Sequence, residues 1–427
     1  MNALFWISTL YLAEGLPYIA VNTLSVIMYK NMGISNAEIA FFTGWLYLPW
    51  VIKPFWSPFV DILRTKRWWV LFTQISIAIA FGLLALLLPG SLAFKSSLII
   101  FWIIGFLSAT HDIAADGFYM KALDSSDQSF YVGFRSAFYR LATILGQGGI
   151  VMGAGYLEKS TGSVPLAWSL TFAGLSLLFL LFALWHFKAM PSVERNAGSA
   201  GHKSPKQIIS EFGNTFATFF KKREVVVAIL FMLLYRFPEA QLVKMINPFL
   251  LDARQVGGLG METSQVGLVY GTIGIIGLTL GGILGGMLVS RYGLRRCLWP
   301  MALALTLPCA VFCWMSMAQP DHSDLVDMVL INAAVFFEQF GYGVGFTSFM
   351  LYMIYFSQGE LQTSHYSICT AFMALGMMIP GMFAGWIQQQ LGYVGFFWWI
   401  MVCCLVTLAV TALIKVDGSY GIKQSEQ

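Results

Sequence analysis

Ten charged residues occur in apolar stretches of this chain, and their types favour proton transfer and anion binding. They are Glu14, Lys53, Asp112, Asp116, Arg135, Arg140, Arg236, Glu239, Lys244 and Glu338. A charged group at membrane depth costs about 3 kcal/mol or more, so such residues persist mainly as ion pairs or beside a water-filled cavity. Because the set contains five acids and five bases, an ion-pair scaffold is one interpretation of every member.

The acids are candidates for proton coupling. Asp112 and Asp116 are four residues apart, which places both carboxylates on one face of a helix. Two like charges this close in a low dielectric favour uptake of a proton by one of them. Glu14 and Glu239 each lie near a proline in the middle of an apolar stretch, where a freed carbonyl and a bend make a polar notch. The expected proton-coupling residues are Asp112, Asp116, Glu14, Glu239 and Glu338.

The bases predict an anionic substrate. Arginine stays charged and binds carboxylates through two parallel hydrogen bonds. We expect Arg140 and Arg236 near mid-membrane, although Arg236 can instead pair with Glu239 three residues away. Tyrosine rings near these positions suit stacking on sugars, whereas most aromatic residues of a membrane protein simply pack. The expected substrate contacts are Arg140, Arg236, Arg135, Lys53, Tyr119, Tyr139 and Tyr342.

The elements that carry these residues are predicted to be membrane-spanning helices. Of 427 residues, 58% are hydrophobic and 11% are charged, against about 25% charged in soluble domains. A span needs about 20 mostly apolar residues. Twelve segments satisfy this: 3–29, 37–60, 68–88, 97–121, 130–155, 166–187, 224–251, 264–289, 297–317, 327–356, 365–389 and 395–415. The sequence therefore predicts an all-α polytopic membrane protein with twelve transmembrane helices.

Basic residues give the orientation. Of the 25 lysines and arginines, 16 fall in the terminal segments and loops of one side and four in those of the other, which predicts that both termini are cytoplasmic. The first stretch contains Glu14 and Pro17 and has no small-residue cleavage site, so we interpret it as a retained span. The six cysteines lack metal-ligand spacing, and we expect neither a metal nor a cofactor.

The two halves of the chain repeat each other. Leu145-Gly146 matches Leu375-Gly376 at an offset of 230 residues, and Asp112 corresponds to Glu338 at an offset of 226. Parallel repeats of six helices resemble the architecture of the major facilitator superfamily, in which the substrate site lies between the halves. We expect a six-helix bundle over residues 1–187, a cytoplasmic linker over 188–223, a second bundle over 224–417 and a tail over 418–427.

A basic loop supports the same architecture. The segment from Gly286 to Arg296 resembles the superfamily's loop motif, in which a glycine packs helices closely and basic residues latch the cytoplasmic face. The corresponding loop of the first half keeps the acid of the motif as Asp61. Ordinary positive-inside loops are the alternative interpretation. The expected gating residues are Asp61, Arg64, Arg67, Arg291, Gly293 and Arg295.

Further motifs resemble the bacterial muropeptide permeases of the AmpG type, a branch related to acetyl-CoA transporters. The matching strings are Ser108–Asp116, Gly15-Leu16-Pro17, Lys53–Pro58, Tyr235–Glu239 and Glu338–Gly343. The resemblance implies proton-driven import, across the bacterial inner membrane, of anhydromuropeptides or related amino-sugar disaccharides for cell-wall recycling. It implies a monomer whose partners are an anionic glycopeptide or sugar, protons and the lipid bilayer, with no nucleic acid.

Two alternatives remain open at this stage. The first is a facilitator that carries another oligosaccharide or an acidic small molecule. The second is a membrane-embedded, metal-dependent transferase, since the spacing of Asp112 and Asp116 resembles the metal-binding pairs of such enzymes. Those enzymes need a second acidic cluster to hold magnesium and diphosphate, whereas the later stretch offers only Glu338. We therefore expect a transporter and no enzyme.

Overall fold

The computed structural model describes residues 3–57, 60, 64–90, 92–123, 131, 135, 138–192, 205–359, 362–418 and 420–421. Every regular element within these ranges is helical. Nine helices of the described part are long and apolar enough to cross a bilayer. The last of them, His365–Leu413, contains Gly392 with non-helical backbone angles (φ 66°, ψ 176°). The all-α polytopic fold expected from the sequence is confirmed, while the number twelve stays a prediction.

Contacts within the chain form two compact units, which are described separately. Unit 1 comprises Met1–Met32 and Ile52–Phe212, and unit 2 comprises Gly33–Val51 and Gly213–Gln427. A short helical segment from the first half of the sequence thus packs with the second half. The bundle, linker and tail bounds expected above stay a prediction.

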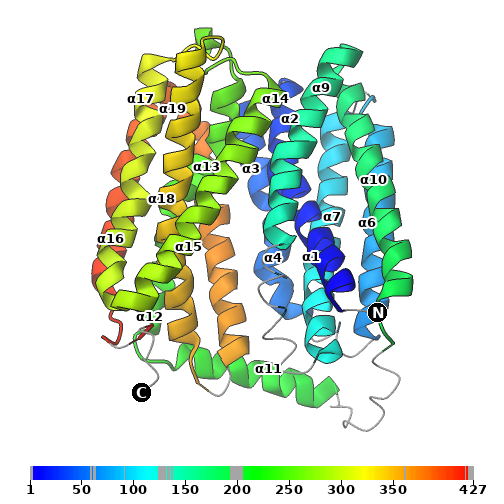
Figure 1. Ribbon diagram of the computed structural model, residues 1–427. Coiled ribbons are helices and arrows are strands. Elements are labelled where there is room, and N and C mark those ends of the chain that lie inside the picture. The colour runs from blue at the N-terminus through cyan, green and yellow to red at the C-terminus, as the bar shows by residue number, and fades with distance from the viewer. Residues whose placement is uncertain are drawn as a thin grey trace. The chain divides into compact units, whose positions relative to one another are not determined.

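Unit 1 is built from long helices that pack side by side. They are α1 (Ala3–Ile19), α2 (Ser25–Asn31), α6 (Lys66–Leu87), α7 (Ala93–Ala122), α9 (Val151–Thr161) and α10 (Val164–Ala189), with π-helical turns at Ala20–Leu24 and Leu145–Ile150. Helix α6 packs against α7 and α10, and α1 packs against α7 (Figure 1). Pro17 lies inside α1, and the π-helical turn follows it directly. The polar notch expected beside Glu14 therefore lies in a helix of irregular geometry.

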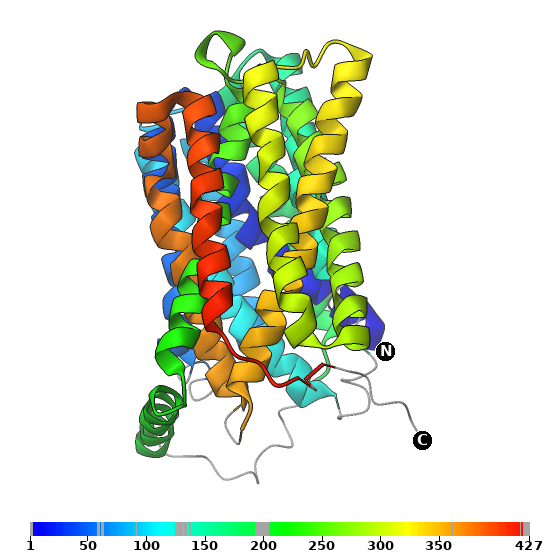
Figure 2. The ribbon, with the colours of Figure 1, turned by 90° about the vertical axis from the view of Figure 1, so that its left-hand side faces the viewer.

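Unit 2 contains α3 (Asn36–Trp45), α12 (Val225–Leu234), α13 (Phe237–Leu251), α14 (Thr263–Val266), α15 (Ile275–Tyr292), α16 (Leu294–Thr306), α17 (Ala310–Ala318), α18 (Leu325–Ser357) and α19 (Gln362–Leu413). The yellow and yellow-green helices of this unit run side by side in Figure 2, and α15 and α16 both pack against α18. Helix α11 (Pro205–Phe220) joins the units in the chain. Its residue Phe219 is buried against Phe356 and Phe372, which anchors the end of α11 on unit 2.

Glycines bring α15 and α18 into close contact. A Cβ at Gly277 would lie 2.6 Å from the carbonyl oxygen of Phe336, and Gly281 and Gly285 face α18 in the same way. A Cβ at Gly286 would meet nothing within 4 Å. The close packing expected of the basic-loop glycine is therefore made by a stripe with four-residue spacing, the small-residue pattern of membrane helix pairs.

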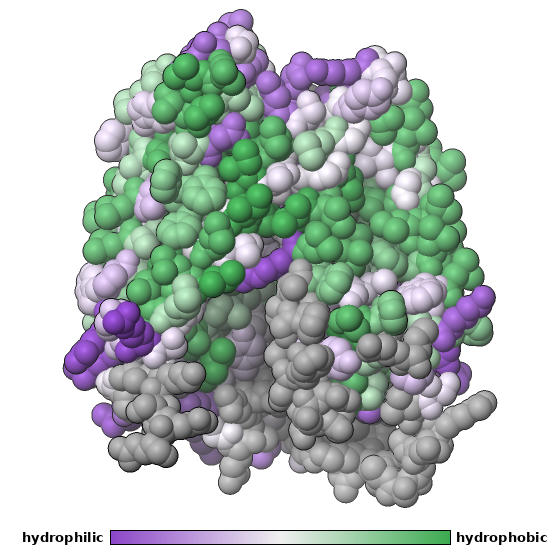
Figure 3. Space-filling view, in the orientation of Figure 1, coloured by the Kyte–Doolittle hydropathy of each residue, from purple (hydrophilic) through white to green (hydrophobic). Residues whose placement is uncertain are grey.

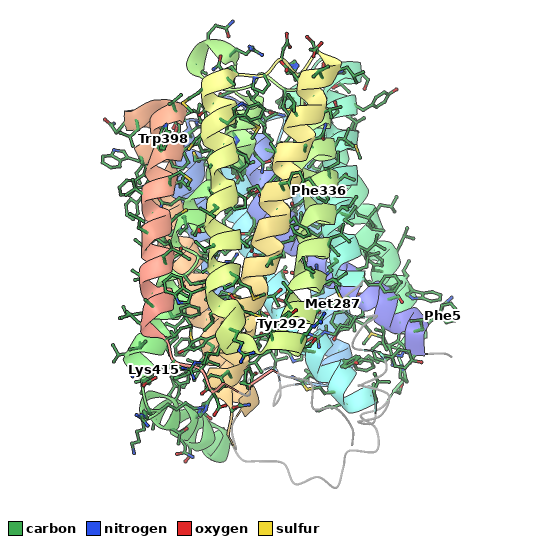
Figure 4. All side chains as sticks on the ribbon, turned by 60° about the vertical axis from the view of Figure 1, so that its left-hand side comes forward. Phe5, Met287, Tyr292, Phe336, Trp398 and Lys415 are labelled. Carbon is green, nitrogen blue, oxygen red and sulfur yellow. The ribbon has the colours of Figure 1, made fainter. Side chains whose placement is uncertain are left out.

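The sides of the helices present apolar surface. Hydrophobic residues cover the long helices on the face in Figure 3, and hydrophilic residues gather toward the ends. Trp398 and Phe5 project outward in Figure 4 and are 53% and 57% exposed, and Met287 is 56% exposed. Large exposed apolar side chains of this kind are suited to lipid contact.

Candidate functional site

Unit 1 places Asp116 of α7 in a cationic and aromatic setting. Arg135 Nη2 lies 2.7 Å from Asp116 Oδ1, and the hydroxyl of Tyr11 donates a hydrogen bond of 3.1 Å to the same oxygen. The Arg135 guanidinium stacks 4.6 Å from the centroid of the Tyr11 ring and 5.7 Å from that of Tyr119. Two expected substrate contacts, Arg135 and Tyr119, thus join an expected proton-coupling acid in one cluster.

Asp112 faces a different cation. Its Oδ2 lies 3.9 Å from Nζ of Lys53, with the side chains 16% and 29% exposed respectively. Lys53 follows α4 (Leu48–Ile52) in a short 3₁₀ turn, Lys53–Phe55. The two carboxylates expected to share a proton therefore each have a base beside them. Their mutual repulsion is offset by these ion pairs.

Glu14 differs from both aspartates. It is 8% exposed, and its Oε2 atom accepts no hydrogen bond from the part of the chain that the structure describes. No base among the described residues forms an ion pair with it, although Asp116, Asp112, Arg135 and Lys53 act on it electrostatically. A buried carboxylate without a cation is costly in its charged form, and this sets Glu14 apart from Asp112 and Asp116, which each have a base beside them.

The other predicted residues of unit 1 are less enclosed. Arg140 is exposed, and Tyr139 is half-buried with its backbone and ring beside Gly15 of α1. A Cβ at Gly15 would lie 2.7 Å from that of Ala142, so this glycine allows the segment 138–144 to approach α1. Tyr139 is thereby held near the helix that carries Glu14.

Unit 2 holds a buried bidentate ion pair. Helix α12 ends before Tyr235 and α13 begins at Phe237, so Arg236 lies at the break between them. Its Nε and Nη2 each donate a 2.7 Å hydrogen bond to the carboxylate of Glu239, and Nη2 donates a third of 2.7 Å to the hydroxyl of Tyr342. The pairing of Arg236 with Glu239 that the sequence left open is thus present, and Tyr342 accepts a further hydrogen bond from the same arginine.

Glu338 lies in the same unit, and no base of the described residues forms an ion pair with it. It is 4% exposed, and its one hydrogen-bond donor among the described residues is the neighbouring Gln339 amide, at 2.8 Å. Among the described residues, the charged group that acts on it electrostatically is Glu239, which carries a like charge. Glu338 therefore resembles Glu14: each is a buried acid that the described part of the chain leaves without a cation.

Comparison with known proteins identifies the family of this chain. The family model described as Major Facilitator Superfamily matches residues 7–379. The chain belongs to this superfamily.

Relatives of this facilitator include bacterial permeases. It is 24% identical over 417 residues to a protein of Rickettsia conorii called putative transporter AmpG 4, with 95% of each chain covered. It is also 24% identical over 393 residues to the anhydromuropeptide permease of Escherichia coli K12, covering 90% of this chain and 74% of the permease.

Among solved structures, this facilitator resembles a D-xylose–proton symporter with a TM-score of 0.74 at 14% identity, covering 99% of both chains. The protein is a multi-pass membrane transporter with the superfamily fold, and the rival transferase interpretation is not favoured.

The predicted gating residues occur at the ends of helices. Arg67, near the start of α6, donates a 3.0 Å hydrogen bond to Ser192 and stacks on Phe187 at the end of α10. Arg64 stacks on Trp68. Arg67 thus connects α6 to the end of α10 within unit 1, whereas Asp61 lies outside the described residues, and the gating role of both stays a prediction.

In unit 2, Arg291 stacks on the ring of Tyr292 at the end of α15, with 5.3 Å to its centroid. Gly293 adopts a φ of 79°, which favours glycine, and so lets α16 begin at once. Arg295 is exposed, and its guanidinium lies near Gly418.

One buried polar chain was not anticipated from the sequence. The side-chain amide of Gln74 lies 3.0 Å from His111 Nε2 and 3.0 Å from His186 Nδ1, and His186 Nε2 lies 2.9 Å from the Thr9 hydroxyl. These residues connect α7, α6, α10 and α1. His111 thus faces a different partner from its neighbour Asp112. The available signal was a glutamine and two histidines in apolar helices.

Proposed function

We propose that this transporter is a proton-coupled importer of anhydromuropeptides or related amino-sugar disaccharides. It acts as a monomer in the bacterial inner membrane with both termini cytoplasmic, and it carries out no chemical step on its cargo. The cargo rests on the permease relative of E. coli and on the cationic, tyrosine-lined cluster of unit 1. Arg135 and Lys53 are proposed as contacts for acidic groups of the cargo, with Tyr119 as a stacking surface.

The observation that carries proton coupling is the pair of buried acids without a cation. Glu14 is 8% exposed and Glu338 is 4% exposed, and neither forms an ion pair with a described base. Burying an ionised carboxylate in such a place has a high desolvation free energy, and protonation removes this cost because it neutralises the charge. Each acid therefore gains a proton where it is enclosed and releases it where water reaches it, which is the cycle a symporter needs.

The aspartates are proposed to act in a second step. Asp112 and Asp116 are held by Lys53 and Arg135, so an anionic cargo that binds to these bases competes with the carboxylates. A carboxylate that loses its base becomes a better proton acceptor. Cargo binding and proton uptake are thereby linked through shared bases.

The test is uptake of labelled anhydromuropeptide into proteoliposomes, with and without an outward-acidic pH gradient. Wild-type protein is expected to accumulate the cargo only with the gradient. Glu14→Gln and Glu338→Gln are expected to abolish accumulation while still exchanging labelled for unlabelled cargo, since exchange needs no net proton movement. Glu262→Gln, at an exposed acid, is the matched control and is expected to accumulate cargo normally.

The outcomes separate the parts of the proposal. If Glu14→Gln and Glu338→Gln both retain gradient-driven accumulation, the assignment of the proton sites is wrong. If the protein takes up another class of sugar and no muropeptide, the proposed cargo is wrong, while the assignment as a transporter stands. If accumulation does not depend on the pH gradient but depends on a sodium gradient, the coupling ion is sodium and the proposed proton coupling is wrong.

A further inference from the structure

A lysine is buried in unit 2 with no acidic partner among the described residues. Lys244 of α13 is 2% exposed. Its ammonium group donates one hydrogen bond, of 3.0 Å, to the hydroxyl of Thr43 on α3, and lies 4.9 Å from the centroid of the Tyr47 ring. No carboxylate of the described residues lies within ion-pair distance of it. A lysine ammonium group carries three hydrogen-bond donors. One hydroxyl and the face of one aromatic ring stabilise its positive charge less than a carboxylate would.

Neighbouring groups give this amine a defined place. The aliphatic stem of Lys244 runs past Gly381 of α19, where a Cβ would lie 3.4 Å from Lys244 Cγ. Asn247 lies three residues further along α13, on the same side of the helix. It is 3% exposed, and its amide oxygen accepts no hydrogen bond from any described residue. Within the described part of the chain, one helical turn thus carries a cation without an anion and an acceptor without a donor.

A purely structural role does not account for the Lys244 ammonium group and the Asn247 amide oxygen. An ion pair that acts as a scaffold is present at the start of α13, where Arg236, the residue before the helix, donates two hydrogen bonds of 2.7 Å to Glu239. An apolar residue in place of Lys244 would fill the same space without the desolvation cost of an ammonium group. The unmatched groups of Lys244 and Asn247 are complementary to a ligand that brings an anionic oxygen and an N–H or O–H donor.

We propose that Lys244 and Asn247 form a subsite for a carboxylate group of the cargo. The ammonium of Lys244 binds the carboxylate, and the amide oxygen of Asn247 accepts from an adjacent N–H or hydroxyl. An acylated amino acid has this combination, with its carboxylate and amide N–H one carbon apart. The subsite rests on the proposed function, because it names the part of the cargo that unit 2 recognises.

Helix α3 covers the subsite in this structure. The Thr43 hydroxyl occupies the acceptor position that a carboxylate oxygen would take, and Thr43 is fully buried. Entry of the ligand therefore requires α3 to draw back from α13. A carboxylate oxygen is a charged acceptor, whereas the Thr43 hydroxyl is neutral. The hydrogen bond from Lys244 to the ligand is therefore stronger than the one to Thr43 that it replaces.

The test measures carboxylate preference in the purified full chain. Binding is followed by thermal shift and calorimetry for anhydromuropeptide, for N-acetylmuramic acid and for N-acetylalanine, each with a free carboxylate and as its primary amide. Wild-type protein is expected to bind the free acid of at least one pair about tenfold or more tightly than the amide. Lys244→Met is expected to bind acid and amide within twofold of each other, and Lys244→Arg to keep a preference for the acid. The control Lys415→Met removes a lysine that is 81% exposed and is expected to behave as wild type.

Each result decides a separate point. If folded Lys244→Met or Lys244→Gln keeps the wild-type preference, the subsite is refuted, and muropeptide uptake by the wild type leaves the proposed function standing. If the wild type takes up no muropeptide but prefers another acid in a Lys244-dependent manner, the subsite stands and the proposed cargo fails. If the wild type prefers no acid over its amide, the subsite is refuted whatever the uptake result.

Discussion

Neutralising Glu239 is expected to destabilise the protein far more than neutralising Asp116, although both carboxylates lie 2.7 Å from an arginine nitrogen. The two ion pairs differ in burial. The side chains of Arg236 and Glu239 are 11% and 12% exposed, whereas those of Arg135 and Asp116 are 31% and 40% exposed. Water screens the second pair and leaves the first largely unscreened.

The expected magnitudes follow from that difference. Glu239→Gln keeps the shape of the side chain but leaves Arg236 as a buried charge without an anion, at a cost of about 3–5 kcal/mol. Asp116→Asn removes a pair of the exposed class, which contributes about 0.2–1 kcal/mol, and the asparagine oxygen still accepts from Tyr11. The double variant Arg236→Gln with Glu239→Gln removes both charges and is expected to recover part of the loss.

The assay is thermal unfolding of the detergent-solubilised variants, followed by tryptophan fluorescence. Glu239→Gln is expected to lower the melting temperature by roughly 6–20 °C, and Asp116→Asn by about 4 °C or less. The double variant should melt between wild type and Glu239→Gln. The reasoning is refuted if Asp116→Asn is as damaging as Glu239→Gln, or if the double variant is the sum of its two single changes.

Two further predictions concern packing and pH. Gly385→Ala would place a Cβ against the backbone carbonyl of Asn36 on α3, and it is expected to lower the free energy of unfolding by about 1–3 kcal/mol. Gly286→Ala would place a Cβ where no atom of the described residues lies within 4 Å. In the same melting assay it should raise the free energy of unfolding by up to about 1 kcal/mol. Equal losses for both alanines would contradict this. Hydrogen bonds from the backbone N–H and hydroxyl of Ser323 hold the pKa of the Asp321 carboxyl below its usual range, so Asp321→Asn should lower the melting temperature at pH 7, and the difference should shrink as pH falls through the ordinary aspartate range. A difference that grows toward low pH would refute it.

The sequence predicted those features that depend on local spacing. Apolar stretches gave the helices, because a bilayer demands a continuous run of apolar residues. The three-residue separation of Arg236 and Glu239 identified a possible pair, since both groups belong to one turn of chain. The partners of Asp112 and Asp116 could not be inferred in this way. Lys53 and Arg135 reach them from other segments, and only the folded helices bring those groups together.

Glycine packing was also beyond the sequence alone. Hydropathy does not distinguish a glycine against a neighbouring backbone from one that faces open space, as the contrast of Gly281 and Gly286 shows. The association of α3 with unit 2 has the same origin. Gly385 and Gly44 lie against Asn36 and Met382 at that contact, so complementary shape, rather than any periodic pattern, joins α3 to α19.

Ion-pair geometry ranks the buried acids as proton carriers. A carboxylate can take up a proton repeatedly only if its charged form has no firm partner to lose. Glu239 is held by two short bonds in a buried site, and Asp116 by one short bond and a tyrosine hydroxyl. Glu14 and Glu338 pair with no described base and therefore stand first, whereas Asp116 and Glu239, which are held by short bonds to arginines, stand last. Proton affinity and ion pairing are alternatives for a buried carboxylate, so the acids that stabilise the helices most are those least able to carry protons.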